Sequence, residues 1–284
     1  MELAENIKET VQRALAEDLG SGDVSADLID PNQQSEANVI CRDIAILAGK
    51  DWFDEVFRQI DDSVNIEWNY YDADVIEAGA TLCTLSGNSR ALLSGERVAL
   101  NLLQTLSATA TQTDRYAELI GGFHARILDT RKTLPNLRQA QKYAVTCGAG
   151  KNHRMGLYDM ILIKENHIMA AGSITQAIEQ ARKLHPTLQI EVETENMEEY
   201  AEASAANPNI IMLDNFSIED LQEAVAQNEG KSIKLEASGN VTLETVRSIA
   251  DTGVDFISVG DITKNIKAID LSMRFTTLNS PITN

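Results

Sequence analysis

The pattern of hydrophobic and polar positions changes after Gly121-Gly122 and divides the chain into two kinds of sequence. Before this point, short apolar segments are mixed with amphipathic helical patterns, as in an α+β unit. After it, near-continuous apolar runs recur with amphipathic helical segments or loops between them. Such runs predict the strands of a parallel sheet that helices cover. The six runs are 125–128, 160–163, 189–192, 209–213, 232–235 and 255–259.

The first third is expected to begin with an amphipathic helix that ends before the turn at Gly20–Asp23. A second amphipathic helix is expected around residues 52–60. Residues 92–120 have a helical pattern too, as one helix or two. Four short strands are predicted in this part of the chain, at 37–41, 44–47, 64–70 and 81–85.

The helices of the second part carry start signals. Ser173 and Ser217 each precede an amphipathic segment, and Thr242 precedes the segment LETVRSIADTG. Side-chain oxygens at such positions accept hydrogen bonds from the first backbone N–H groups of a helix. Six strand units predict an open or incomplete α/β barrel, with a doubly wound sheet as the alternative. The polar C-terminal residues 276–284 are expected to fray.

The amino-acid composition argues against several classes of function. The chain of 284 residues has 24 Lys and Arg against 43 Asp and Glu, a net charge of −19 at pH 7. Nucleic acids and anionic membrane surfaces would repel such a protein. No apolar run approaches the roughly 20 residues needed to cross a bilayer. Three cysteines at no metal-like spacing predict a reduced protein without a disulfide framework, and we expect it to be cytoplasmic.

One segment reverses this acidic balance. Between Thr130 and Lys164, seven basic residues and His153 accompany a single acid, Asp159. An excess of cations within an anionic protein needs counter-charge, which a small polyanionic ligand would supply. A basic surface helix is the alternative. The basic residues are Arg131, Lys132, Arg138, Lys142, Lys151, Arg154 and Lys164.

Polar and charged residues follow each of the six apolar runs. In parallel α/β folds the carboxyl ends of the strands meet at one edge, where catalytic groups gather. Chains also leave strands through polar turns. Six ends that carry Arg, Lys, Glu, Asp and Ser-Gly nevertheless indicate one functional site at this edge. These ends are 129–132, 164–167, Glu193, 214–215, 236–240 and 260–261.

Glu193 and Asp214 end successive runs and are predicted to lie at neighbouring positions of the sheet. Oxygen ligands in this arrangement suit Mg²⁺, which binds through one or two carboxylates, waters and substrate phosphates. Alternatively, each carboxylate caps a helix or pairs with a nearby lysine. Ser238-Gly239-Asn240 and Gly260 are similar to the phosphate site that barrels build from their last loops, with plain turns as the alternative.

The loop 148–154, GAGKNHR, is a candidate to bring backbone N–H groups and cationic side chains to an anion. His153 is interpreted as an anion donor rather than a proton shuttle, and His167 as structural. No Ser or Cys lies at a spacing that suggests nucleophilic acyl chemistry. Together these features predict two anionic ligands. One carries phosphates that Mg²⁺ and glycine-rich turns would bind, and the other carries carboxylates that Arg and Lys would bind.

Several longer segments form a specific combination in a fixed order. They are SGERVALNLLQTLSATAT (94–111), DTRKTLPNLR (129–138), GAGKNHRMGLYDMILIKENHI (148–168), IEVET (190–194), IMLDN (211–215), LEASGNV (235–241) and FISVGDITK (256–264). In these segments the sequence resembles the quinolinate phosphoribosyltransferase family, also called nicotinate-nucleotide pyrophosphorylase (carboxylating). EDLGSGDVS in the N-terminal third agrees with it. Two positions depart from the family pattern: Ala149 replaces a usual glycine, and Asp261 replaces a usual small residue.

The resemblance implies an α/β fold with an N-terminal α/β sandwich domain at 1–107 and an open α/β barrel at 108–270. The segment from about 271 to 284 is a candidate to return to the first domain. The resemblance also implies a homodimer in which Arg97 reaches the active site of the other subunit, at the mouth of the barrel. The implied reaction is phosphoribosyl transfer from phosphoribosyl pyrophosphate to quinolinate with decarboxylation, a step of NAD biosynthesis. Mg²⁺ is the implied cofactor.

The resemblance further implies roles for the site residues. Lys132, Glu193 and Asp214 are expected to be catalytic, and the two acids are expected to bind Mg²⁺ through water. Arg131, Arg154 and Lys164 would hold the pyridine dicarboxylate. The residues expected to bind substrate are Arg97, Thr130, Arg131, Lys132, His153, Arg154, Lys164, Glu193, Asp214, Ser238, Gly239, Asn240 and Gly260.

Three other functions are compatible with the sequence. A close relative that acts on another aromatic acid would carry the same groups. A Schiff-base aldolase would use Lys164 at the end of its apolar run. A non-catalytic binding dimer would bind the ligands without turnover.

Overall fold

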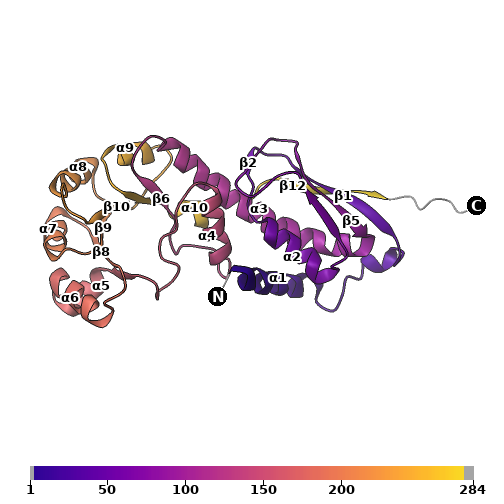
Figure 1. Ribbon diagram of the computed structural model, residues 1–284, viewed down its shortest axis with the longest axis horizontal. Helices are drawn as coiled ribbons and strands as arrows, with labels where there is room; N and C mark the ends of the chain where they lie inside the picture. The colour runs from indigo at the N-terminus through magenta and orange to yellow at the C-terminus, as the bar shows by residue number, and fades with distance from the viewer. Residues whose placement is uncertain (1–2, 278–284) are drawn as a thin grey trace, which may run out of the picture. The chain divides into compact units, whose positions relative to one another are not determined.

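The computed structural model describes residues 3–277 and forms two compact units (Figure 1). The first unit extends to Gln112 and also contains Leu134–Gly148 and residues 265–277. The second unit contains Thr113–Thr133 and Ala149–Lys264. The sequence had suggested one boundary after residue 107 and a return near residue 271. The segment Leu134–Gly148 is the main difference, because it leaves the second unit between two of its strands.

The first unit is built on an antiparallel sheet with the strand order β12-β1-β5-β3. Helices α2 and α3 pack on this sheet, and Trp52, Phe53 and Phe57 of α2 are buried in the shared core (Figure 1). The short pair β2–β4 adds a strand, β4, that the sequence analysis did not predict. The elements are α1 Leu3–Leu19, a 3₁₀ turn Ala26–Leu28, β1 Gln34–Cys41, β2 Ala45–Ile46, α2 Lys50–Ile60, β3 Asn65–Trp68, β4 Val75–Ile76, β5 Thr81–Asn88, α3 Ser89–Leu119, α4 Arg138–Cys147 and β12 Leu271–Thr277.

Helix α3 is one continuous helix of 31 residues, where the sequence left one or two open. Its stretch of small residues lets a neighbouring segment approach closely. Ser107 Oγ accepts a hydrogen bond from the backbone N–H of Ala48 at 3.1 Å. Thr111 Oγ1 accepts one from the N–H of Ile46 at 2.9 Å. The polar atoms of this helix therefore satisfy backbone groups that the two-residue strand β2 leaves unpaired.

The C-terminal segment does return to the first unit. Strand β12 pairs antiparallel with β1, for example Phe275 with Ala37. Thr276 and Thr277, which were expected to fray, belong to this strand, so that expectation was wrong for them. Residues 278–284 lie outside the described residues.

The second unit is an open barrel of parallel strands in the order β6-β11-β10-β9-β8-β7. Each of the six predicted apolar runs overlaps one of these strands, although β10 begins two residues later than the run 232–235. Each strand from β7 to β10 pairs with the next in sequence, and β6 pairs with β11, which is the cyclic order of a barrel. Among the described residues, β6 and β7 do not pair with each other, so the barrel stays open there. The bounds are β6 Arg126–Leu128, β7 Ile161–Ile163, β8 Ile190–Thr194, β9 Ile210–Asp214, β10 Lys234–Ser238 and β11 Phe256–Ser258.

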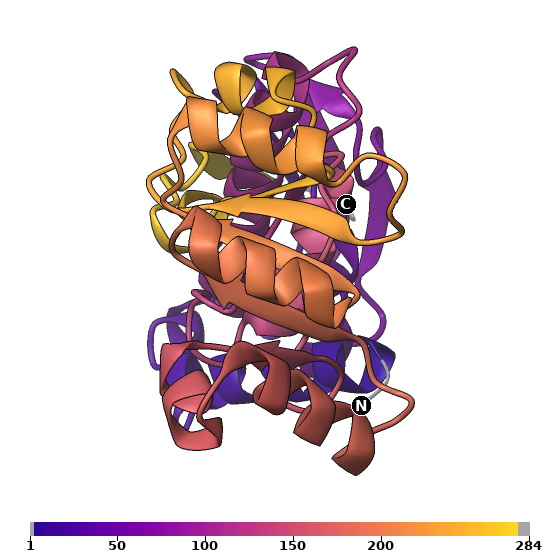
Figure 2. The same ribbon diagram turned by 90° about the vertical axis from the view of Figure 1, so that its left-hand side faces the viewer.

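The helices of this unit lie on the outer side of the strands. Helices α6, α7 and α8 form one row beside β8, β9 and β10, and the quarter turn in Figure 2 views this row with the strands behind it. A doubly wound sheet would reverse its strand order and carry helices on both faces. The barrel prediction is confirmed, and the alternative is wrong. The helices are α5 Glu165–Ala171, α6 Ile174–Leu184, α7 Met197–Ala206, α8 Ile218–Gln227, α9 Val246–Asp251 and α10 Asp261–Lys264.

Two of the three predicted helix starts are confirmed. Ser173 accepts a hydrogen bond from the N–H of Gln176 at 3.2 Å, and Ser217 accepts one from Asp220 at 3.1 Å. The prediction for Thr242 was wrong, because α9 begins only at Val246. The N–H of Thr242 instead donates to Thr245 Oγ1 at 3.0 Å, and this turn delays the helix.

Ala149 is exposed and has a left-handed backbone with a φ of 62°, in which a Cβ atom is strained. We expect Ala149→Gly to raise the free energy of unfolding by about 1 kcal/mol. The matched control is Ala201→Gly at an exposed position of α7. There the glycine should lower the free energy of unfolding by about 1 kcal/mol. Urea unfolding of both variants checks the opposite signs, and a loss of stability in both would contradict the strain.

Candidate active site

A cavity of about 450 Å³ lies at the carboxyl edge of the barrel strands in the second unit. It unites side chains from the end of every strand, as the sequence predicted for this edge. The position follows from the fold, because parallel strands bring all their carboxyl ends to the same side. Its lining residues are Thr130, Arg131, Lys132, His153, Arg154, Leu162, Lys164, Glu193, Met212, Asp214, Ser238 and Ser258.

The cavity lining follows the two-residue period of the strands. Side chains two positions apart on a strand point to the same face of a sheet. Leu162 therefore lies below Lys164, and Met212 lies below Asp214, inside the barrel. Leu162, Met212 and Ser258 were not predicted, because only residues at the ends of the apolar runs were expected at this edge. Counting back two positions from Lys164, Asp214 and Gly260 leads to all three.

The cationic part of the cavity contains two guanidinium groups, those of Arg131 and Arg154. Burial, and then the charge of Arg131, lowers the pKa of Arg154. Arg154 also donates from Nη1 to the carbonyl of Met160 at 3.4 Å. Two like charges held in one partly buried cavity repel each other, so an anion bound between them would be stabilised.

The position of Lys132 is fixed by its backbone. Its N–H donates to Thr130 Oγ1 at 3.0 Å, and its carbonyl accepts from Thr263 Oγ1 at 2.9 Å. A Cβ atom added to Gly260 would lie 3.2 Å from Cδ of Lys132. Gly260 therefore lets the stem of Lys132 lie against the backbone after β11.

The anionic part of the cavity contains Glu193 and Asp214. Glu193 Oε2 forms an ion pair with the ammonium group of Lys164. Asp214 Oδ2 accepts a hydrogen bond from the side chain of Asn215 at 2.8 Å. Pairing of Glu193 with a lysine is the alternative that the sequence left open. It does not exclude a role in cation binding, since a carboxylate has a second oxygen and the two acids form an oxygen donor set of the kind that Mg²⁺ prefers.

The turn after β10 is built so closely that only glycine fits in it. Gly239 has a φ of 93°, and a Cβ atom there would lie 2.2 Å from Oδ1 of Asn215. Asn240 donates from its side chain to the same oxygen at 3.1 Å. Ser238 lines the cavity directly, and Gly239 and Asn240 follow it. This packing joins the turns after β9 and β10.

The loop 148–154 does not present its backbone N–H groups as predicted. The N–H of Lys151 donates to Ile127 of β6 at 2.8 Å, so this residue extends the edge of the barrel. The N–H of His153 donates to Asp129 at 2.9 Å. The N–H of Arg154 donates to Nδ1 of His153 at 2.7 Å. These three N–H groups form hydrogen bonds within the chain. The loop contributes the side chain of Arg154 to the cavity instead.

The predicted basic segment is divided between the two units. Arg131, Lys132, Arg154 and Lys164 line the cavity. Arg138 and Lys142 lie on α4 in the first unit. Arg97 lies on α3, also in the first unit, and is therefore not one of the groups that the second unit brings together.

His167 has the structural role that the sequence favoured. Its Nδ1 accepts a hydrogen bond from the backbone N–H of Lys164 at 3.0 Å, at the start of α5.

Asp261, one of the two departures from the family pattern, begins α10. Burial and then the charge of Asp261 raise the pKa of the Tyr116 hydroxyl to about 12.

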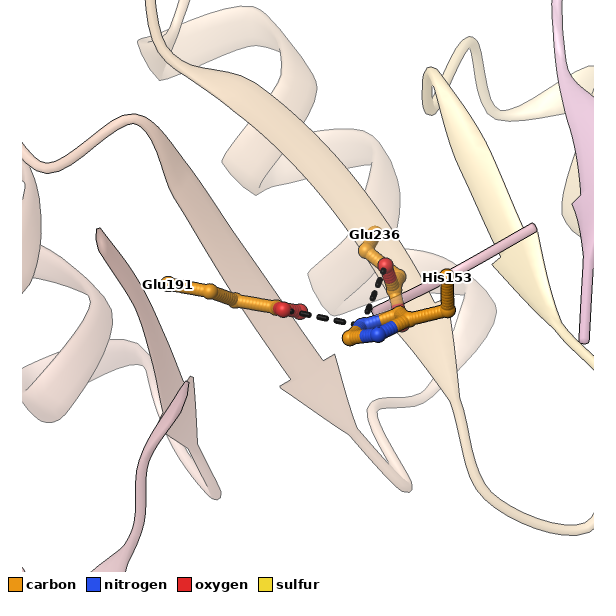
Figure 3. A group of neighbouring side chains, drawn as sticks. All are labelled: His153, Glu191 and Glu236. Carbon is orange, nitrogen blue, oxygen red and sulfur yellow. Dashed lines mark ion pairs between the residues drawn. The ribbon is translucent and has the colours of Figure 1, made fainter. Parts of the chain in front are cut away.

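Beneath the cavity lies a buried group that sequence analysis missed, formed by His153, Glu191 and Glu236 (Figure 3). Glu191 lies two positions before Glu193 on β8, and Glu236 lies two positions before Ser238 on β10. Both glutamates are fully buried. A signal was present for Glu191, which is an acid inside the apolar run 189–192, whereas Glu236 directly follows the run 232–235.

This buried pair predicts a pH dependence of stability. Burial raises the pKa of Glu191 to about 7, and burial together with the charge of Glu191 raises that of Glu236 to about 8. The folded protein thus holds protons that the unfolded chain releases above about pH 4.5. Stability is therefore gained at low pH and lost as the pH rises toward 8, by at most about 1.4 kcal/mol per pH unit for one proton.

Glu236→Gln should remove much of this slope, because the amide stays neutral at every pH. Urea unfolding of the wild type and of Glu236→Gln between pH 5 and 9 measures how the free energy of unfolding of each depends on pH. An equal slope in the two proteins would contradict the assignment.

Comparisons with known proteins agree with this geometry. Two family models match the chain, the N-terminal domain of quinolinate phosphoribosyl transferase over residues 23–107 and its C-terminal domain over residues 109–274. The chain belongs to the quinolinate phosphoribosyltransferase family. The resemblance seen in the sequence motifs is confirmed, and with it the enzyme class, a phosphoribosyltransferase.

Individual members of this family match over nearly the whole chain. A probable nicotinate-nucleotide pyrophosphorylase (carboxylating) of Bacillus subtilis is 40% identical over 97% of this chain and 96% of its own. A mitochondrial quinolinate phosphoribosyltransferase (decarboxylating) of Nicotiana glauca is 39% identical over 96% of this chain and 83% of its own. The solved nicotinate-nucleotide pyrophosphorylase of Francisella tularensis superposes with a TM-score of 0.94 at 47% identity, over 97% of this chain and 98% of that one. None of the described helices is long and apolar enough to cross a membrane.

Proposed function

We propose that the protein transfers the phosphoribosyl group of phosphoribosyl pyrophosphate to quinolinate and releases CO₂, which gives nicotinate mononucleotide and pyrophosphate. The observation that carries this proposal is the single cavity in which Arg131, Arg154 and Lys164 lie together with Glu193 and Asp214. The names of the relatives support the same substrate and the same decarboxylating transfer.

Quinolinate fits the cationic part of the cavity by charge. Its two carboxylates on neighbouring ring carbons supply the anion that the repelling Arg131 and Arg154 need. Guanidinium groups bind carboxylates in a planar, bidentate manner, which orients the ring as well as holding it. An oriented ring nitrogen beside the ribose carbon C1 contributes the proximity part of catalysis.

Phosphoribosyl pyrophosphate would occupy the side of Lys132 and the turn Ser238–Asn240. Lys132 is positioned to stabilise charge that grows on the departing pyrophosphate. Glu193 and Asp214 favour the cationic character of the sugar in the transition state. The same two carboxylates would hold Mg²⁺, as the oxygen donor set allows. When bound, Mg²⁺ supplies charge stabilisation for pyrophosphate.

Decarboxylation follows from the transfer itself. The ring nitrogen gains a positive charge when its lone pair forms the bond to C1 and the bond to pyrophosphate breaks. The bond to the adjacent carboxylate can then break, because its electron pair is stabilised beside the cationic nitrogen. CO₂ leaves, and a proton takes its place on the ring. This sequence requires no further electron-accepting cofactor.

We further propose a cytoplasmic homodimer in which Arg97 completes the site of the other subunit. Arg97 belongs to the unit that does not contain the cavity, as expected for a group supplied by a partner chain. The three free cysteines, of which Cys41 and Cys83 are buried, suit a reducing compartment.

Incubation with quinolinate, phosphoribosyl pyrophosphate and Mg²⁺ tests the function. The expected products are pyrophosphate, CO₂ and nicotinate mononucleotide in equal amounts. Turnover of nicotinate without turnover of quinolinate would contradict the substrate. Borohydride trapping of a carbonyl substrate on Lys164 would favour an aldolase instead, whereas we expect no adduct because this lysine is ion-paired with Glu193.

A further inference from the structure

The side chains of His153, Glu191 and Glu236 meet in the barrel interior, and their facing atoms lie within 4.8 Å of one another (Figure 3). The imidazole lies between the two carboxyl groups, which come from β8 and β10. Nε2 of His153 is 2.9 Å from Oε2 of Glu191 and 3.7 Å from Oε2 of Glu236. The side chain of His153 is only 8% exposed. Three ionisable groups buried this deeply require a specific role or a specific compensation.

The other ring nitrogen determines which role is possible. Nδ1 of His153 accepts a hydrogen bond from the backbone N–H of Arg154 at 2.7 Å. Nδ1 therefore carries no hydrogen, and the ring proton is on Nε2, facing Glu191. By its residue types the group resembles a site for a transition metal. A metal would need the lone pair of Nε2, however, and this tautomer does not offer it.

The group has supporting contacts with β11 and with the end of β6. Ser258 donates a hydrogen bond to Oε1 of Glu236. The N–H of His153 donates to Asp129 at 2.9 Å, at the end of β6. A continuous set of contacts thus runs from β10 and β8 through the imidazole to the backbone of Arg154. The side chain of Arg154 then enters the cavity.

We propose that Glu191 and Glu236 are positioning residues, which hold the imidazole of His153 and through it the backbone of Arg154 at the end of the cavity that binds the pyridine dicarboxylate. This inference rests on the proposed function, because it names the residues that orient one substrate. It also changes the interpretation of His153. With Nδ1 bound to Arg154 and Nε2 directed at Glu191, the ring acts as a fixed neutral spacer and not as a cationic anion donor.

The proposal predicts a defect that is specific to one substrate. Glu191→Met keeps the approximate size of the side chain but removes the carboxyl group that faces Nε2. We expect KM for quinolinate to rise about tenfold or more, with KM for phosphoribosyl pyrophosphate unchanged within about twofold. Glu191→Gln offers an amide oxygen to the same N–H, and should restore KM for quinolinate to within about threefold of the wild type. Equal increases of both KM values in Glu191→Met would overturn the proposal.

A matched control distinguishes positioning from general loss of stability. Glu55 is a buried glutamate of α2 that pairs with Arg58 in the first unit. Glu55→Met should lower the melting temperature while both KM values stay at the wild-type level. A rise in KM for quinolinate in this control, equal to that in Glu191→Met, would count against a positioning role.

The tautomer can be measured without any turnover. The chain has four histidines, so imidazole ¹⁵N spectra are simple, and the signal absent from His153→Gln identifies His153. We expect a protonated Nε2 and a bare Nδ1 at pH 7. A proton on Nδ1, a doubly protonated ring, or a stoichiometric transition metal in the purified protein would each overturn the proposal. A wild type that shows this tautomer but no turnover of quinolinate would refute the proposed function and leave the geometry of the buried group intact.

Discussion

Replacing Arg131 by alanine is expected to lower kcat/KM for quinolinate about a thousandfold without destabilising the fold. The guanidinium would form two charge-assisted hydrogen bonds with one carboxylate of quinolinate. Losing both should weaken the binding free energy by several kcal/mol. Burial, and then the charge of Arg131, lowers the pKa of Arg154, so the two guanidinium groups repel each other. Removing Arg131 relieves this repulsion, so the melting temperature should stay the same or rise. Steady-state kinetics and thermal unfolding of one preparation give both results.

Arg126 provides the matched control, because it lies at the opposite end of the same strand, β6. Its guanidinium donates to the carbonyls of His124 and Ala125 at 3.1 and 3.0 Å, away from the carboxyl edge. Arg126→Ala should leave kcat/KM within about twofold of the wild type. Similar losses of activity in the two variants, or a large loss of stability in Arg131→Ala, would contradict the assigned role.

The second large effect concerns the proposed dimer. Arg97→Ala and Lys132→Ala should each be inactive, whereas a mixture allowed to exchange subunits should recover about a quarter of wild-type activity. Half of the randomly formed dimers contain one subunit of each kind. In such a dimer, one barrel with an intact Lys132 receives an intact Arg97 from its partner. Activity of the mixture before and after exchange measures this recovery.

Mixing Lys132→Ala with Glu193→Gln is the control for this experiment. Both residues line the same cavity of one chain, so each barrel in every mixed dimer stays defective. No activity should return. Recovery here, or confirmed exchange with Arg97→Ala and no recovery there, would show that the site is not shared as proposed.

The barrel and its functional edge could be predicted because both depend on short-range regularities. An apolar run such as IMLDN ends in a polar residue, and parallel strands place all such ends at one edge. Asp214 and Glu193 were predicted in this way, without any knowledge of their partners. The same alternation extends inward to Glu191 and Glu236. Glu191 was missed because it lies inside the run 189–192, and Glu236 was expected at the end of a strand, whereas β10 extends to Ser238.

Other features depend on contacts between distant parts of the chain, and sequence patterns do not contain them. Helix α4 has the charge pattern of its neighbours in sequence, yet it packs in the first unit, where Lys142 is fully buried. The N–H groups of the loop 148–154 were expected to face a ligand, but β6, Asp129 and His153 accept them. The hydrogen-bond partner of a backbone N–H group depends on which residues the fold brings next to it.

A crystal structure with quinolinate bound gives the most direct test of the central claim. The ligand should lie in the cavity of the second unit, with its two carboxylates in contact with Arg131 and Arg154 and its ring nitrogen toward Glu193 and Asp214. A well-ordered ligand elsewhere, or one in this cavity that touches neither arginine, would contradict the account.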